Sequence, residues 1–149
     1  MKKLQINAAF QIQKPVQEVY DAIVDPQKMV NYFISKSSGI MEEGKTLWWE
    51  FPEFEESYPV RVGKLVLNEF ISFSWDIGEK ELTVEIALLP QNNGSTLIKI
   101  TEKEMDNDDD GIKWLMENSG GWANFLACLK AYLEYGINLR KGGFDFMRK

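Results

Sequence analysis

Histidine is absent from this 149-residue sequence, and cysteine occurs once, at Cys128. The lack of histidine removes the commonest general base and the usual member of a catalytic triad. A single cysteine excludes an internal disulfide and suits a reducing compartment, so we expect a cytoplasmic protein. Cys128 has apolar neighbours in the sequence, and we interpret it as a small core or boundary residue rather than a nucleophile.

Several other sequence features are also missing. The chain has no run of 18 apolar residues that could span a bilayer, and its first residues alternate instead of forming the apolar block of a signal peptide. Seventeen basic residues against 23 acidic ones give a net charge of −6, so we expect neither a nucleic-acid partner nor membrane insertion. No glycine-rich phosphate loop, cysteine cluster with metal-ligand spacing or serine elbow occurs, and we expect no cofactor.

Apolar and aromatic residues are plentiful by contrast. Hydrophobic residues make up 44% of the sequence, with five tryptophans and nine phenylalanines. A chain of this length is expected to form one domain, covering residues 1–149, and to bury about two-thirds of its unfolded surface. The composition therefore predicts a large aromatic core.

The dominant element is a predicted helix over residues 112–137 that ends at Gly136. At 100° per residue its bulky apolar side chains fall on one arc. They are Leu115, Trp122, Phe125, Leu126, Leu129, Tyr132 and Leu133. The arc's far side carries Lys113, Asn124, Ala131 and Glu134. A helix of about 25 residues spans roughly 37 Å, so its expected partner is a wide sheet.

The rest of the chain reads as strands around two short helices. Residues 3–13 alternate as a half-buried strand. Pro15 precedes a first short helix, and Asp25 caps a second one, which starts at Pro26 and is expected to continue to Ile34. From Gly39 to Glu102 the pattern predicts three hairpins, which pair 39–43 with 46–51, 58–67 with 70–77, and 80–89 with 95–103. The tail after Gly142 is expected either to fray or to dock through Phe144 and Phe146.

This element order predicts an α+β fold. A curved antiparallel sheet of about six to seven strands would wrap around the long C-terminal helix, with two short helices after the first strand.

Three groups of residues carry a family resemblance. They are Pro15, Val19-Tyr20, Ala22-Ile23 and Asp25-Pro26 near the start, Phe73-Ser74-Trp75 in the middle, and Gly121, Trp122, Leu126, Leu129, Leu133 and Glu134 in the last helix. In this order they resemble the family named for the activator of heat shock protein 90 ATPase homologues, within the START-like (SRPBCC, Bet v allergen-like) superfamily. The resemblance implies a helix-grip (START-like) fold. The resemblance does not imply chaperone activation, because the activators have a further N-terminal domain for which we expect no room here.

The resemblance implies a cavity between sheet and last helix that accepts lipids, polyketides or other apolar molecules. We therefore predict non-catalytic binding of a small hydrophobic (lipid-, polyketide- or flavonoid-like) molecule, with aromatics that serve first as core. The predicted ligand-binding residues are Phe33, Trp49, Phe51, Phe73, Trp75, Val84, Ile86, Ile98, Asn118, Trp122, Phe125 and Leu129.

Two features of the last helix leave alternatives open. Gly120 and Gly121 each cost about 1 kcal/mol relative to alanine inside a helix. Either Ser119 caps a helix that begins at Gly120, or the missing side chains leave space for a cavity mouth beside Trp122, under the segment that carries Met29, Phe33 and Ile34. Asn118 falls within the apolar arc, where strand groups could satisfy its amide or the amide could be a polar contact in the pocket.

The acidic loop before the helix fits a calcium-binding pattern. Asp106, Asp108, Asp110-Gly111 and Glu117 have the spacing of an EF-hand loop. However, Lys113 occupies a position that is usually apolar, and the loop follows a strand. Acidic residues also favour a helix N-terminus without a metal, so we predict an acidic helix start and no metal site.

Two rival functions use other features. One is an enzyme that cyclises or hydrolyses a polyketide-like substrate with Glu, Asp or Tyr and water. The other is a co-chaperone-like protein-partner module, for which the acidic stretch 102–110, expected to be exposed, is the one hint. We expect a monomer or weak dimer.

Overall fold

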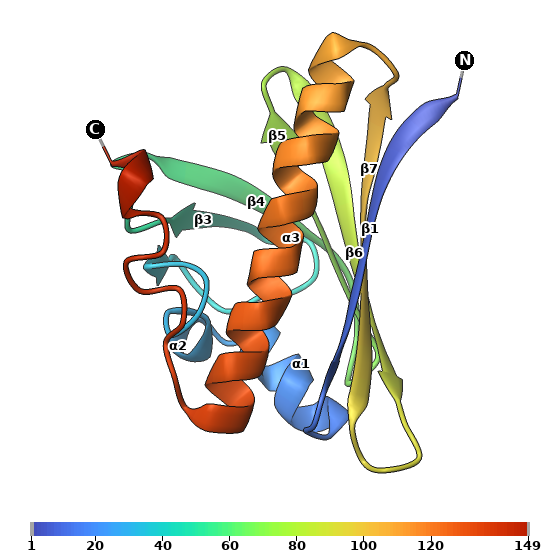
Figure 1. Ribbon diagram of the computed structural model, residues 1–149, viewed down its shortest axis with the longest axis vertical. Coiled ribbons are helices and arrows are strands. Elements are labelled where there is room, and N and C mark those ends of the chain that lie inside the picture. The colour runs from blue at the N-terminus through green and yellow to red at the C-terminus, as the bar shows by residue number, and fades with distance from the viewer. Residues whose placement is uncertain (1, 149) are drawn as a thin grey trace.

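The computed structural model describes residues 2–148 and shows a seven-stranded antiparallel sheet beside one long helix (Figure 1). The strand order is β1-β7-β6-β5-β4-β3-β2. The elements are β1 (Lys3–Ile12), α1 (Val16–Val24), α2 (Pro26–Met29), β2 (Lys36–Ser37), β3 (Thr46–Glu50), β4 (Ser57–Val66), β5 (Phe70–Ile77), β6 (Lys80–Pro90), β7 (Thr96–Asp106), α3 (Asp109–Tyr135) and the 3-10 turn η1 (Asp145–Met147). The predicted helix-grip fold is confirmed.

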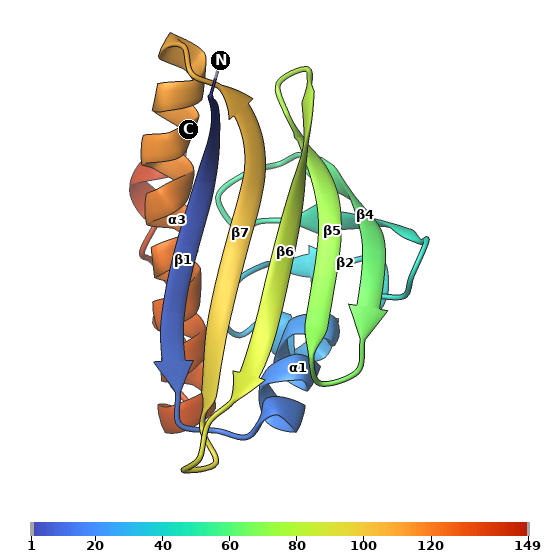
Figure 2. The same cartoon turned by 90° about the vertical axis from the view of Figure 1, so that its right-hand side faces the viewer.

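The central strands follow the alternation of their sequences. In β6, every second side chain from Leu82 to Leu88 is buried, while the residues between are partly exposed. β5 pairs with β6 from Phe70↔Ala87 to Ile77↔Lys80, so the apolar sides of the two strands coincide. Figure 2 shows β1, β7, β6, β5 and β4 side by side, with α3 behind β1. The sheet therefore presents one apolar face to the helix.

Both ends of α3 are set by local chemistry. The Asp108 side chain accepts a hydrogen bond from the Gly111 backbone N–H at 2.8 Å and caps the N-terminus. A Cβ atom at Gly111 would collide with the Asp106 carbonyl oxygen, so the strand-to-helix junction requires glycine there. At the other end Gly136 adopts φ 66°, the left-handed conformation that commonly ends a helix. The predicted end at Gly136 is confirmed.

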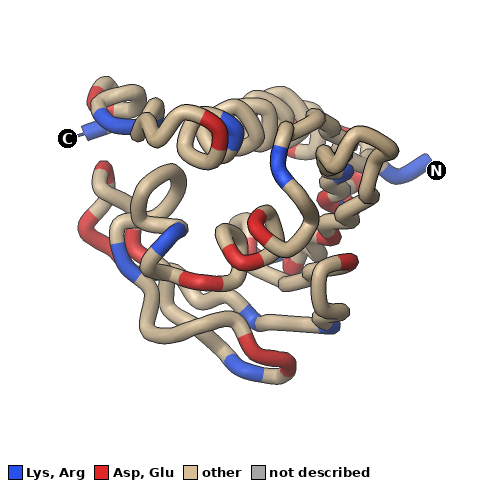
Figure 3. Tube along the Cα trace, turned by 90° about the horizontal axis from the view of Figure 1, so that it is seen from below, with Lys and Arg blue, Asp and Glu red and all other residues tan. Residues whose placement is uncertain are grey.

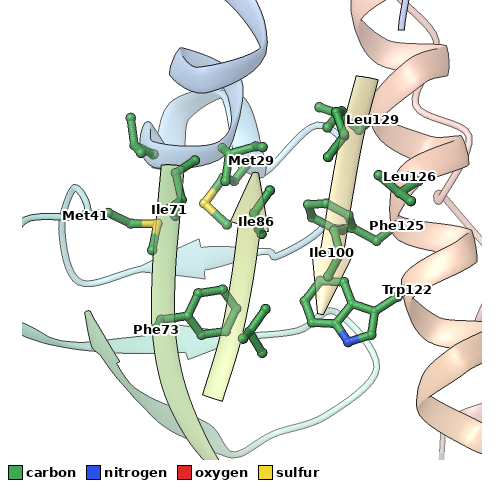
Figure 4. Packing of buried hydrophobic residues seen from close by; sticks show 14 of the residues in the cluster. Met29, Met41, Ile71, Phe73, Ile86, Ile100, Trp122, Phe125, Leu126 and Leu129 are labelled. Atoms are coloured by element: carbon green, nitrogen blue, oxygen red, sulfur yellow. The ribbon is translucent and has the colours of Figure 1, made fainter. Parts of the chain in front are cut away.

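The buried face of α3 packs on the side of the sheet formed by β1 and β7. Figure 4 shows Trp122, Phe125, Leu126 and Leu129 directed towards strand residues such as Ile100. These four helix residues are at most 4% exposed. The helix also buries Trp114, which the predicted arc did not include.

The first predicted hairpin is wrong. Residues 39–43 form no strand, and β3 pairs instead with β2, through Lys36↔Glu50 and Ser37↔Trp49. The hydroxyl of Ser37 bonds both the N–H and the carbonyl of Gly39, which turns the chain out of the sheet. The Met41 N–H then donates to the Val24 carbonyl in α1 at 3.2 Å. This segment therefore forms no backbone ladder with the sheet; Met41 bonds to α1, and the Glu43 carboxylate accepts from the Leu65 N–H of β4 at 2.8 Å.

The second short helix is shorter than predicted. Its start is as expected, since Asp25 accepts from the Gln27 N–H at 2.9 Å and Pro26 occupies the first helical position. It ends at Met29, where the Asn31 side chain donates to the carbonyls of Gln27 and Lys28. Such side-chain bonds compete with continuation of a helix, so residues 30–33 form turns.

Charged side chains are distributed over the molecule. Figure 3 shows basic and acidic positions interspersed along the trace, without a gathering of basic residues in that view. Within residues 2–148, no helix combines the length and apolarity needed to cross a membrane.

We predict that Leu129→Ala will lower the free energy of unfolding by about 2–5 kcal/mol, because it removes a buried side chain that packing cannot fully replace. Leu129 is 0% exposed, whereas Leu67 is 71% exposed and provides the control Leu67→Ala. Chemical denaturation measures both. A loss below about 0.5 kcal/mol for Leu129→Ala, the size typical of surface changes, would show that the sheet does not grip the helix.

Candidate functional site

A cavity of about 450 Å³ lies between α3 and the sheet, towards β3, β4 and β5. Most of its lining is aromatic or aliphatic, with a few polar groups. The lining residues are Tyr32, Phe33, Trp49, Phe51, Glu53, Phe54, Tyr58, Pro59, Trp75, Asp76, Ile77, Asn118, Gly121, Trp122, Asn124, Phe125, Cys128, Arg140, Phe144 and Met147. A concave apolar space with few polar groups is the usual make-up of a small-molecule site.

Phe33 lies at the centre of the aromatic lining. Its ring centroid is 4.8 Å from that of Phe125, 5.4 Å from Phe51 and 5.6 Å from Trp49, each in an edge-to-face arrangement. Such arrangements place ring edges against ring faces and are favourable beyond the area they bury. The turn after α2, strand β3 and helix α3 are therefore joined by aromatic contacts around the cavity.

Gly121 opens the helix side of the cavity. Helix α3 is continuous through Ser119, so the alternative in which Ser119 caps a helix beginning at Gly120 is wrong. An added Cβ at Gly120 or Gly121 would meet no atom within 4 Å. Gly121 lines the cavity and Gly120 does not. The glycine pair thus leaves open space, and part of that space adjoins Trp122 as predicted.

A buried carboxylate stands behind the cavity wall. Glu102 on β7 is 0% exposed and does not line the cavity. It accepts hydrogen bonds from Trp75 Nε1 at 2.7 Å, Trp122 Nε1 at 3.0 Å and Asn118 Nδ2 at 3.1 Å. One N–H group of the Asn118 amide is therefore paired with a strand side chain, and Asn118 also lines the cavity. The expectation that the whole stretch 102–110 is exposed is wrong, since Glu102 continues the buried face of β7.

The segment after α3 closes one side of the cavity. We call residues 136–148 the C-terminal strap; Figure 1 shows it running back from the end of α3 past α2. Arg140 forms two hydrogen bonds to Glu53, at 2.8 and 3.0 Å, and the side chains are 13% and 3% exposed. The Arg140 guanidinium also lies 4.8 Å from the Phe144 ring centroid and 5.8 Å from that of Phe51. Phe144 docks as one alternative predicted, whereas Phe146 is 81% exposed.

Two further cavity residues carry ionisable groups in apolar surroundings. Burial holds the pKa of the Tyr32 hydroxyl well above its ordinary value, and this hydroxyl donates to the Ala22 carbonyl at 2.7 Å. Burial also raises the pKa of the Cys128 thiol, and the positive charge of Arg140 partly opposes that shift. A raised pKa leaves little thiolate, so Cys128 has the character of an inert wall residue.

The structure divides the predicted ligand-binding residues into two groups. The group that lines the cavity is Phe33, Trp49, Phe51, Trp75, Asn118, Trp122 and Phe125. The other group, Phe73, Val84, Ile86, Ile98 and Leu129, is at most 2% exposed and is absent from the lining. These five fill the packed layer between sheet and helix, so their prediction as ligand contacts is corrected here. Ligand contact by the first group stays a prediction.

Sequence reasoning missed several lining residues. Glu53, Phe54, Tyr58 and Pro59 come from the β3–β4 connection and the start of β4, and Arg140, Phe144 and Met147 come from the strap. Periodicity carries no information about the irregular β3–β4 connection and the strap, and it does not show which side chains at the start of β4 border a cavity. The predicted arc puts Asn124 on its far side, whereas in the structure Asn124 lines the cavity together with Gly121 and Phe125.

The acidic loop has structural partners. Asp106 pairs with Lys3 and Lys80, and Asp108 caps α3. Among the described residues, no group of three His, Cys, Asp or Glu side chains is arranged to hold a metal ion. Gly111 is one position of the EF-hand-like pattern, but glycine is required there because a side chain would collide with the Asp106 carbonyl oxygen.

Comparisons with known proteins identify relatives of the whole fold. The model of the family described as Activator of Hsp90 ATPase homolog 1-like protein matches residues 13–134. The crystal structure of protein SSP2350 from Staphylococcus saprophyticus is 31% identical, with a TM-score of 0.81 over 92% of this chain and 96% of that one. No curated protein sequence matches.

Two further structures are similar in fold. The Aha1 dimer from Colwellia psychrerythraea is 20% identical, with a TM-score of 0.77 over 89% of this chain and 98% of that one. DynU16, from the dynemicin biosynthetic locus, is 20% identical, with a TM-score of 0.79 over 90% of this chain and 48% of DynU16.

We predict that millimolar calcium will leave the melting temperature unchanged beyond a general salt effect that magnesium reproduces, because the acidic loop caps a helix. Thermal unfolding with each salt measures this. A saturable rise with calcium alone, lost in Glu117→Gln, would instead reveal a metal site.

We predict that Glu53→Gln will loosen the C-terminal strap and speed the reaction of Cys128 with an aromatic disulfide reagent. Breaking a buried pair by removing one partner costs about 3–5 kcal/mol, because Arg140 is left buried and unpaired. The variant keeps the Arg140 charge. Because Cys128 is the sole thiol, its reaction rate reports how easily the reagent enters the cavity.

The control is Asp145→Asn, the same chemical change at an exposed pair that Asp145 forms with Arg148 within the strap. Its reaction rate should equal that of the parent. Equal rates in parent and Glu53→Gln, or an equal increase in Asp145→Asn, would contradict a closing role for the Glu53–Arg140 pair.

Proposed function

Since this chain belongs to the family of Activator of Hsp90 ATPase homolog 1-like proteins, we propose that it binds a small hydrophobic molecule in the cavity between α3 and the sheet. Binding is non-catalytic, and the ligand is planar and aromatic, as in flavonoid- or polyketide-like compounds. The observation that carries this proposal is the aromatic lining of the cavity, in which rings from the turn after α2, from β3, β5 and α3, and from the strap surround one space.

The size and chemistry of the cavity support a ligand of a few fused or linked rings. A volume of about 450 Å³ lies within the range of small-molecule pockets, roughly 300–1,000 Å³. Rigid aromatic walls favour a flat, rigid ligand, because ring faces and edges make specific contacts and little conformational freedom is lost on binding. A flexible fatty acid would lose more freedom in the same space.

The charged groups of the cavity support binding rather than acid–base chemistry. Glu53 is held by Arg140, and Asp76 accepts from Arg61 Nη2 at 2.8 Å. Both cavity carboxylates are thus engaged with guanidinium groups, which favours structural roles for them. The place of DynU16 in a biosynthetic locus adds that this fold occurs among proteins of small-molecule biosynthesis.

We predict that flavone will quench tryptophan emission saturably, because Trp49, Trp75 and Trp122 line the cavity. Gly121→Leu should weaken this binding by at least about tenfold, or ~1.4 kcal/mol, because the new side chain occupies cavity space. The matched control is Gly120→Leu, an equal change one residue away that does not line the cavity and should keep the parent affinity.

Both variants should keep the fold, since neither position crowds another atom at Cβ and both glycines disfavour a helix. Equal binding by parent and Gly121→Leu across a panel of flavonoid-like and fatty-acid ligands would contradict the proposed location. Absence of binding by the parent to every compound in the panel would contradict the proposed function.

A further inference from the structure

We infer that Glu102 is a positioning residue that sets which ligands the cavity accepts. It holds the indole N–H groups of Trp75 and Trp122 behind the cavity wall, so that a ligand meets ring carbons and no hydrogen-bond donor from these two indoles. At these two indoles the cavity wall thereby favours an apolar aromatic ring over one with an acceptor substituent. The ligand part of the inference rests on the proposed function, whereas the orientation of the indoles does not.

The carboxylate of Glu102 fixes the orientation of both indoles, because it accepts a hydrogen bond from each. Oε2 of Glu102 accepts from Trp75 Nε1 on β5, and Oε1 accepts from Trp122 Nε1 on α3. The two ring centroids are 5.7 Å apart with an interplanar angle of 33°. One carboxylate on β7 thus connects two strands and the helix at the place where sheet and helix approach each other.

The direction of the indoles follows from which residues reach the cavity. Trp75, Trp122 and Asn118 line it, while their shared acceptor Glu102 does not and is 0% exposed. The two indole N–H bonds and one N–H bond of the Asn118 amide are therefore directed into the protein towards Glu102. The side chains turn the rest of their surface, largely indole carbon, towards the ligand space.

The cluster needs a carboxylate in particular. Three donors converge on two oxygens, and an ionised carboxylate is a pure acceptor at both. Within residues 2–148, no lysine or arginine forms an ion pair with Glu102, so neutral N–H groups provide its stabilisation. Hydrogen bonds to a charged group are among the stronger ones, particularly where water is excluded.

Glu102→Gln separates positioning from bulk packing. Glutamine has the same shape, but its amide accepts at one oxygen and donates at the other position. If the amide oxygen of the new side chain still accepts from the two helix donors, Asn118 and Trp122, its NH₂ group faces the Trp75 N–H. Two donors cannot pair, so the Trp75 indole is released and its N–H becomes free to turn towards the cavity.

The first test needs no ligand. Solvent exchange of the indole protons, followed by nitrogen-edited NMR and assigned with single Trp→Phe variants, should be slow for Trp75 and Trp122 in the parent. In Glu102→Gln, exchange at Trp75 should accelerate by at least about tenfold, or ~1.4 kcal/mol of lost protection. Trp114, which is buried outside the cluster, should not change. An unchanged Trp75, or equal acceleration at Trp114, would overturn the inference.

The second test measures specificity with two ligands of nearly equal shape. Fluorene and fluorenone differ by one carbonyl acceptor, and quenching of tryptophan emission gives the affinity of each. The parent should prefer fluorene, and Glu102→Gln should shift the affinity ratio towards fluorenone. Trp75→Phe, which keeps a ring but has no donor, should retain the parent preference.

The outcomes distinguish the two proposals. Equal weakening of both ligands in Glu102→Gln would show a merely structural role and overturn the specificity inference. If the parent binds neither ligand while flavone binds, the specificity inference is overturned alone. If no compound binds the parent, the proposed function fails, and the exchange of the Trp75 indole proton still decides whether Glu102 positions that side chain.

Discussion

One helix cannot cover the concave face of a seven-stranded sheet, and the interior of this protein follows from that limit. The backbone of α3 approaches β1 and β7, where the core residues of sheet and helix meet. Towards β3 and β4 the sheet curves away, and the space is bordered by large aromatic side chains and the strap instead of being filled. The cavity is therefore a consequence of the architecture, and its chemistry depends on which side chains border the uncovered strands.

Two buried carboxylates position the groups around the cavity in different ways. Glu53 pairs with a guanidinium from the strap, while Glu102 is surrounded by neutral donors from the sheet and the helix. Each would be costly to leave unpartnered in the interior, so each fixes the position of the groups that it contacts. The aromatic residues supply the apolar surface, and the carboxylates determine how that surface is oriented.

The sequence predicted the regular elements better than the site. Strand alternation and the arc of α3 predicted the sheet, the helix end at Gly136 and part of the cavity lining, because periodic burial is visible in a sequence. The same alternation places Glu102 on the buried face of β7, after Ile98 and Ile100. Because a charged side chain is normally expected at the surface, this position was not predicted to be buried. The strap pair and the bond from Met41 to Val24 depend on contacts between distant segments, and no local pattern encodes them. Whether an aromatic such as Phe73 or Phe33 borders empty space depends on sheet curvature, which alternation does not specify.

The two edges of the sheet are unequal. β2 has two residues, Lys36 and Ser37, whereas β1 has ten and pairs with β7 along almost its whole length. An edge of two residues offers few free backbone groups, while the outer edge of β1 presents a long row. Backbone pairing with another chain would therefore extend this sheet from β1, which lies away from β3 and β4 and would leave the cavity lining unchanged.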